Sequence, residues 1–152
     1  MKFLPTLVTL LTVAVLLTAA TASLGDGVPA AVHYINADKV AATMVKGGLI
    51  VNDPGLTVQA GRRGAGPQVE YHDHTNHIFI LVEGEATVLA GGTMVDATRT
   101  APDQMRAAGL EGAETYHLTK GDVLTIPAKT PHWFKEVPTK TISYYAVNIE
   151  SQ

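Results

Sequence analysis

Apolar and polar residues alternate through most of the chain after residue 48, and turns rich in Gly, Pro, Asn and Asp interrupt the alternation. Such alternation puts every second side chain on one face of a β-strand. About nine short strands are predicted, over residues 49–51, 56–62, 68–74, 78–82, 86–90, 114–118, 123–126, 132–137 and 141–149. Residues 93–96 are expected to pair back as a hairpin. Short strands at this regular spacing favour an all-β sandwich or closed barrel.

Two stretches depart from the alternation. Residues 37–46 follow Asn36, a good helix N-cap, carry two apolar residues one turn apart, and end at Gly47, which predicts one short helix. Residues 97–112 are polar and rich in Ala and Gly, with Pro102 among them. They are expected to form a loop, with at most one helical turn at 103–108, and to be the most mobile part of the domain.

The first 22 residues have the pattern of a secretory signal. Lys2 gives a positive start, residues 4–20 are mainly apolar, and Ala20-Thr21-Ala22 has the small-x-small form of a signal peptidase site. An uncleaved anchor helix is the alternative, although the stretch is short for a membrane span. The predicted organisation is therefore a signal peptide at 1–22, a leader with a short helix at 23–48, and a barrel at 49–152, in a secreted or periplasmic protein with no stable membrane anchor.

Composition narrows the function classes. The chain has 152 residues and a formal net charge of −3, which suits one domain with a hydrophobic core. This charge gives no reason to expect nucleic acid as a partner. The sequence contains no cysteine, which excludes disulfides, thiolate chemistry and any zinc site with cysteine ligands.

Histidines are concentrated at two places. Three of the six lie within the run His72-Asp73-His74-Thr75-Asn76-His77. In an extended strand His72 and His74 would project from the same face, and His77 follows after a short polar step. His132 comes after a turn containing two prolines and leads into a strand. Because neutral imidazole is the commonest metal ligand among side chains, a metal site is predicted. A solvated polar strand end is the alternative for the first cluster.

The first histidine cluster resembles the first motif of the cupin superfamily, which reads Gly, five residues, His-x-His, three or four residues, Glu, six residues, Gly. Gly66, His72, His74 and Gly84 stand at matching positions. Counted back from Gly84, the family's Glu position is occupied by His77. The segment is one residue shorter than usual, and His77 is the expected substitute for the Glu ligand.

The second cluster resembles the second cupin motif, which reads Gly, five residues, Pro-x-Gly, two residues, His, three residues, Asn. Gly121, Pro127 and His132 match at those spacings. Lys129 stands where the family has Gly, and Glu136 where it has Asn. The resemblance covers about residues 56–149.

This resemblance implies an all-β fold: a single-domain jelly-roll cupin β-barrel with one short N-terminal helix. The implied metal ligands are four histidines: His72, His74, His77 and His132. The residues expected to line the substrate pocket are apolar: Phe79, Leu81, Ile126 and Phe134. No catalytic residue can be assigned from the motifs. The resemblance also leaves open a homodimer formed through the N-terminal strands.

A histidine-only site favours Fe, Cu, Ni or Zn over Mn, and its open positions suit a small chelating substrate. The leading hypothesis is an exported, metal-dependent dioxygenase acting on an oxygen-rich molecule such as an enolate or catecholate. A non-catalytic cupin that binds a small ligand or the metal itself is the alternative. A metal-free, lectin-like barrel is the third hypothesis.

Two further groups of charged residues are candidates for the site. Arg62 and Arg63 are candidates for binding a substrate anion at the barrel mouth, with simple solvent exposure as the alternative. Glu70, Glu83 and Glu85 are candidates for orienting a ring N–H of a ligand histidine.

Overall fold

The structure is a computed structural model that describes residues 31–151. The predicted signal segment 1–22 and residues 23–30 of the predicted leader lie outside the described residues, so both remain predictions. Within residues 31–151, no helix has the length and apolar character needed to cross a bilayer.

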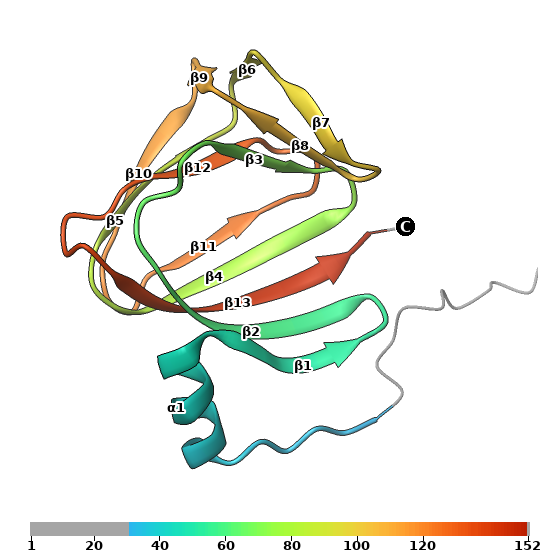
Figure 1. The fold of residues 1–152 in the computed structure, drawn as a ribbon, viewed down its shortest axis with the longest axis vertical. Coiled ribbons are helices and arrows are strands. Elements are labelled where there is room, and N and C mark those ends of the chain that lie inside the picture. The colour runs from blue at the N-terminus through green and yellow to red at the C-terminus, as the bar shows by residue number, and fades with distance from the viewer. Residues whose placement is uncertain (1–30, 152) are drawn as a thin grey trace, which may run out of the picture.

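The predicted short helix is confirmed as α1, Ala37–Lys46. The Asn36 side chain caps it by accepting a hydrogen bond of 2.9 Å from the Lys39 N–H. At the other end, Gly47 has a φ of 72°, and its N–H donates to the Thr43 carbonyl. The helix lies against β1 and β2 (Figure 1), and none of its residues is fully buried. It is therefore an appendage to the sheets rather than part of the core.

The rest of the described chain is built of short strands. They are β1 Gly48–Asp53, β2 Leu56–Arg63, β3 Val69–His72, β4 Thr75–Glu83, β5 Ala86–Ala90, β6 Thr93–Val95, β7 Thr98–Ala101, β8 Gln104–Ala107, β9 Gly109–Glu111, β10 Glu114–Leu118, β11 Val123–Ile126, β12 His132–Glu136 and β13 Ile142–Glu150. The sequence predicts β5, β10 and β11 with these bounds.

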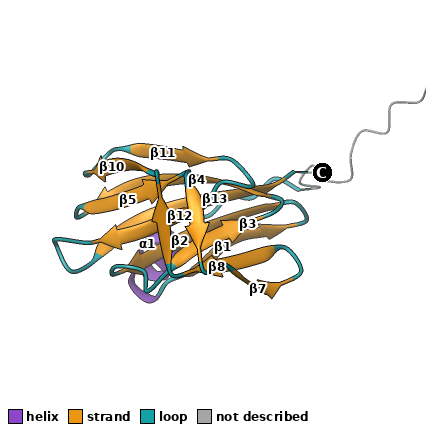
Figure 2. Cartoon of the chain, turned by 90° about the horizontal axis from the view of Figure 1, so that it is seen from above, coloured by secondary structure: helices purple, strands orange, loops and turns teal. Residues whose placement is uncertain are grey.

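Antiparallel pairing joins the strands into two main sheets. One has the order β1-β2-β13-β4-β11 and the other β10-β5-β12-β3-β8-β7, while β6 and β9 form a separate pair. The two large sheets face each other as layers of a jelly roll (Figures 1 and 2). No ladder joins the sheets in residues 31–151, so the predicted barrel is open at its edges rather than fully closed.

The expectation of a loop over residues 97–112 is wrong. This segment contains β7, β8 and β9, and β8 continues the sheet beyond β3 by pairing at four positions, with Met105 opposite Tyr71. Such strands owe their order to backbone pairing with a distant strand, which an Ala- and Gly-rich sequence does not reveal. The hairpin expected for residues 93–96 is also corrected, because β6 pairs with β9. The mobility of the segment remains a prediction.

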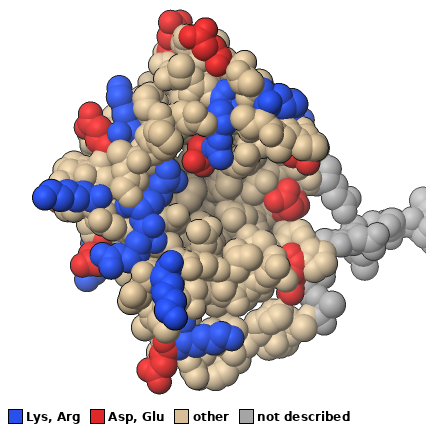
Figure 3. All heavy atoms as spheres, viewed as in Figure 1, with Lys and Arg blue, Asp and Glu red and all other residues tan. Residues whose placement is uncertain are grey.

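The core lies between the two sheets and follows the alternation of the strands. Along β4, His77, Phe79 and Leu81 are buried while the residues between them are more exposed. Ile142 and Val88 reach the same interior from β13 and β5, and both are fully buried. Burying a side chain of this size contributes about 1.5–3 kcal/mol. A space-filling view shows that the space between the sheets stays partly open as a central hollow (Figure 3).

Candidate metal centre

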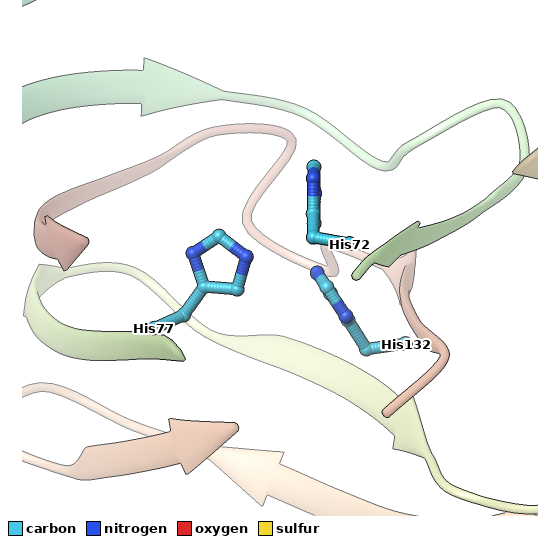
Figure 4. A group of neighbouring side chains, drawn as sticks. All are labelled: His72, His77 and His132. Carbon is cyan, nitrogen blue, oxygen red and sulfur yellow. The ribbon is translucent and has the colours of Figure 1, made fainter. Parts of the chain in front are cut away.

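Three of the four histidines predicted as ligands meet inside the jelly roll. His72 ends β3, His77 lies near the start of β4, and His132 begins β12. One ring nitrogen from each lies within 4.8 Å of the others. Their rings point toward one another from three strands (Figure 4). His77 is 8% exposed and His132 only 2%. The three are called the histidine trio below.

The turn before β12 brings His132 next to His72. The Lys129 N–H donates to the His72 carbonyl at 2.8 Å, which fastens the turn to the end of β3. Lys129 has a φ of 64°, in the left-handed region that favours glycine. The cupin motif has Gly at this position, and in this chain a lysine adopts the left-handed backbone. His132 then enters the sheet opposite both Glu70 and Ala90.

Hydrogen bonds to Nδ1 leave Nε2 of two rings available as an electron-pair donor. His132 Nδ1 lies 3.1 Å from the Thr130 carbonyl, which can only accept, so this nitrogen carries the proton. His77 Nδ1 lies 2.8 Å from Asn148 Oδ1. The Asn148 amide nitrogen donates to Thr57 Oγ1, an arrangement that leaves its oxygen for His77. Outer partners of this kind fix the tautomer of metal-binding histidines.

The interior keeps two members of the trio, His72 and His132, uncharged. Burial, with smaller contributions from the nearby His77 and His72, lowers the pKa of His132 to about 4, although the Thr130 carbonyl and Glu70 act to raise it. Burial, followed by His77, also lowers the pKa of His72. Rings with lowered pKa values are neutral at pH 7, which is the form that binds metal.

The trio passes a test of fit for a cation. His77 Nε2 is buried and has no hydrogen-bond partner in the described part of the chain. A buried polar nitrogen left unpaired costs about 1–3 kcal/mol. A positive ion held among the three imidazoles would satisfy this atom, so the residues present fit a metal ion.

The structure does not bring His74 into this group. β3 ends at His72, and Asp73 and His74 form a bend instead of continuing the predicted strand. Arg99 fixes the bend through a 2.6 Å ion pair with Asp73, whose N–H donates to the Asp103 carbonyl. The His74 side chain is 49% exposed, with Nε2 3.7 Å from Asp103 Oδ1. The expectation that His72 and His74 share a face is therefore wrong.

The four predicted pocket residues differ in their distance from the trio. The Phe79 ring lies 5.4 Å from that of His77 and 6.5 Å from that of His132, measured between centroids. Phe134 packs edge-on against Phe79. Together with Leu81 and Ile126, these two rings belong to the hydrophobic cluster of the core. That these residues contact a substrate remains a prediction.

None of the glutamates considered as ring-orienting partners forms a hydrogen bond to the trio. Glu83 accepts a hydrogen bond from Ser143, Glu85 is exposed, and Glu70 pairs with arginines. Asn148 takes this role for His77, and the sequence alone does not single it out. Its one signal is a place on an alternating strand, which does not reveal the register with a residue far away in sequence.

Comparisons with known proteins support the fold. Neither the family models nor the curated proteins gave a match to the sequence. Among solved structures, FeII HppE matches with a TM-score of 0.50 and 17% identity, over 68% of this chain and 50% of its own. The cupin domain of Cnp3 from Schizosaccharomyces pombe matches with a TM-score of 0.50 and 14% identity, over 69% of this chain and 60% of its own.

Fold and site together place the chain in a class. Two facing antiparallel sheets with a histidine trio between them make it a jelly-roll protein with a candidate metal centre. The chain has the fold of the cupin superfamily, as its two sequence motifs imply. It spans only half the length of the HppE chain that it matches. Sequence identities this low support similarity of the fold alone.

Proposed function

We propose that the protein binds one divalent transition metal at His72, His77 and His132 and acts as a metal-dependent dioxygenase on a small, oxygen-rich chelating molecule. The observation that carries this proposal is the meeting of three histidine rings inside the fold, with the buried Nε2 of His77 unpaired in the described part of the chain. The proposal uses three of the four predicted ligands, because His74 lies on the exposed bend.

The number of ligands favours an enzyme over a closed structural site. Structural zinc sites are usually held by four protein ligands, whereas catalytic sites use three and leave a position for water or substrate. The trio supplies three. A closed site would need a fourth protein ligand, and His74, the predicted one, lies on the exposed bend beside Asp103.

The donor set narrows the metals to test. Imidazole suits Fe, Cu, Ni and Zn, and without a carboxylate ligand the site would keep the full +2 charge of the ion. Such an ion would supply Lewis-acid chemistry and, if redox-active, a route for reaction with dioxygen. Iron is the first to test, since the HppE structure of the same fold is an FeII form.

This chain's own residues have definable roles beside the ion. Asn148 and the Thr130 carbonyl hold the Nδ1 protons of His77 and His132, which directs Nε2 of each ring inward. Phe79 stacks against His77 and keeps water from that side of the trio.

Oxygen uptake tests the reaction. Protein loaded with Fe(II) without oxygen is mixed with catechol or acetylacetone, and dioxygen consumption is followed with an electrode. We expect substrate-dependent uptake in the wild type and in His74→Ala, and none in His132→Ala. Bound metal without any uptake across a panel of diketones and catechols would contradict the dioxygenase and leave the binder. Absence of bound metal would contradict the metal centre and leave only a binder of small ligands.

Export is a second part of the proposal and rests on residues 1–22. Their positive start, apolar stretch and Ala-x-Ala end favour cleavage before Ser23. N-terminal sequencing of protein recovered outside the cytoplasm is expected to begin at Ser23. A sequence that begins at Met1 would contradict cleavage.

A further inference from the structure

Two arginines share one carboxylate beside the trio. Arg106 Nη1 lies 3.2 Å from Glu70 Oε1, and Arg63 Nη2 lies 3.8 Å from the same oxygen. The three side chains come from β8, β3 and β2, so the group bridges both sheets. Arg63, Glu70 and Arg106 are called the arginine pair with its glutamate below.

Strand geometry places this group on the interior side. Glu70 is two residues from His72 along β3, so both side chains leave the same face of the strand. Arg106 stands opposite Glu70 in the pairing of β3 with β8. The Arg63 guanidinium lies 4.8 Å from the centre of the Phe134 ring, which is 3% exposed in the core. These contacts direct the group toward the space that also holds the trio.

The group is also reachable from solvent. The side chains of Arg63, Glu70 and Arg106 are 24%, 27% and 24% exposed, respectively, which is neither core nor free surface. Figure 3 shows the hollow between the sheets, with Lys and Arg side chains on part of its rim. Part of each of these three side chains is therefore accessible to a small molecule.

The charges of the arginine pair with its glutamate do not sum to zero. Two guanidinium groups face one carboxylate, so one positive charge is left over. Arg106 Nη1 is buried and makes no hydrogen bond in the described part of the chain, because its 3.2 Å approach to Glu70 lacks hydrogen-bond geometry. A buried donor without a partner favours an added acceptor. An ion at the trio would add two further positive charges nearby, which makes an anion the preferred occupant.

On the basis of the proposed function, we infer that the substrate is a small organic acid: its chelating oxygens face the histidine trio and its carboxylate pairs with Arg106 and Arg63. Arginine suits this role because its planar group donates two parallel hydrogen bonds to a carboxylate. Two residues along a strand advance by about 7 Å, so His72 and the glutamate that the arginines contact leave β3 about this far apart. A single aromatic ring or a short carbon chain spans this length.

The test uses a matched pair of probes. Catechol carries the chelating oxygens alone, and 3,4-dihydroxybenzoate adds a carboxylate on the far side of the same ring. Their affinities are measured by calorimetry without oxygen, for the metal-free protein and for protein loaded with Zn²⁺, which has no redox chemistry. We expect 3,4-dihydroxybenzoate to bind about ten-fold more tightly than catechol in both forms, as one charged hydrogen-bonded contact predicts.

Substitutions then identify the residues responsible for the tighter binding of 3,4-dihydroxybenzoate. Arg106→Gln and Arg63→Gln should bring the ratio of the two affinities close to one while bound Zn²⁺ is unchanged. Arg62→Gln is the matched control, since Arg62 is the exposed neighbour on the same strand, and it should leave the ratio as in the wild type. Glu70→Gln should raise the ratio, because it frees both arginines from their competing carboxylate.

The outcomes separate this inference from the proposed function. A ratio near one in the wild type, or a ratio that Arg106→Gln and Glu70→Gln leave unchanged, would overturn the organic acid whether or not metal binds. Failure to bind any metal, with the ratio preserved, would overturn the metal centre and leave the anion site standing. Should the arginine variants fail to fold, the opposite shift expected for Glu70→Gln still decides the question.

Discussion

Two regions of the interior are buried to the same extent and differ in what burial does for them. His77 and Phe79 are neighbours on one face of β4, and each is 8% exposed. Removing the Phe79 ring from water contributes about 1.5–3 kcal/mol to stability. Removing the His77 ring leaves Nε2 unpaired, at a cost of about 1–3 kcal/mol. The apolar region is explained by packing, and the histidine region requires a further reason, which a bound metal would supply.

The largest expected effect is the loss of metal when a member of the trio is replaced. His132→Ala should lower metal affinity by more than about 100-fold, since loss of an outer partner of a ligand already costs 10–100-fold. Elemental analysis and calorimetry measure this directly. His117→Ala is the control, because His117 is exposed and lies near Thr87 on another face. Full metal occupancy in His132→Ala would place the site elsewhere.

A substitution in the apolar region should lower stability and leave metal binding intact. Phe134→Ala is expected to reduce the free energy of unfolding by about 3–5 kcal/mol, because it leaves a cavity among core rings. Urea denaturation measures the change, and the folded fraction should still bind one metal ion. Val123→Ala, at a position 58% exposed, should change stability by less than about 0.5 kcal/mol. Loss of metal binding by folded Phe134→Ala would show that the two regions are not separable.

Acid should destabilise the metal-free protein through the histidine region. The pKa of His132 is about 4 in the fold, against 6.5 for an ordinary histidine, so between these values the unfolded chain binds the proton and the folded chain does not. Stability is therefore complete above pH 6.5 and falls as the pH drops toward 4, by up to about 3 kcal/mol. Urea denaturation at several pH values measures the slope. His132→Gln should flatten it, and an equally steep slope in that variant would assign the proton to another group.

Asn148→Ala should weaken metal binding by about 10–100-fold without removing a ligand, because His77 loses the partner that fixes its tautomer. Asn148→Asp keeps an acceptor at the same place and should restore most of the affinity. Calorimetry with Zn²⁺ separates the two variants. Equal affinities for the alanine and aspartate variants would show that the hydrogen bond does not orient the ring.

The smallest effect on metal affinity is expected at His74, the predicted ligand that lies outside the histidine trio. His74→Ala should change metal affinity by less than about two-fold, since its side chain is on an exposed bend beside Asp103. The paired variant His72→Ala should lose the metal. A large loss in His74→Ala would mean that the bend rearranges to bring this ring to the ion.

Local sequence patterns predict features within one strand or turn, and they do not predict contacts between distant segments. The apolar run at residues 78–82 predicted the inner part of β4, and turn residues gave the bounds of β5 and β11. Alternation failed at His74, because it assumes a straight strand and the bend depends on Arg99, a residue 26 positions from Asp73. Contacts between distant segments are not encoded in a local pattern.

The same limit explains the other misses. Asn148 reaches His77 across 71 positions, and Arg106 reaches Glu70 through a strand that the sequence presents as a loop. Both positions depend on the order of strands in the sheets. The cupin resemblance predicted the fold and the meeting of His72 with His132, but the identity of the partners around them required the register of β13 and β8.

The most direct test of the metal centre is a crystal structure of the protein loaded with Zn²⁺, with the ion located by its anomalous scattering. We predict one ion per chain, bonded to a ring nitrogen of His72, His77 and His132 at about 2.0–2.1 Å. His74 should remain beside Asp103 and make no bond to the ion. An ion at His74, or an empty trio in crystals grown with excess Zn²⁺, would contradict the account.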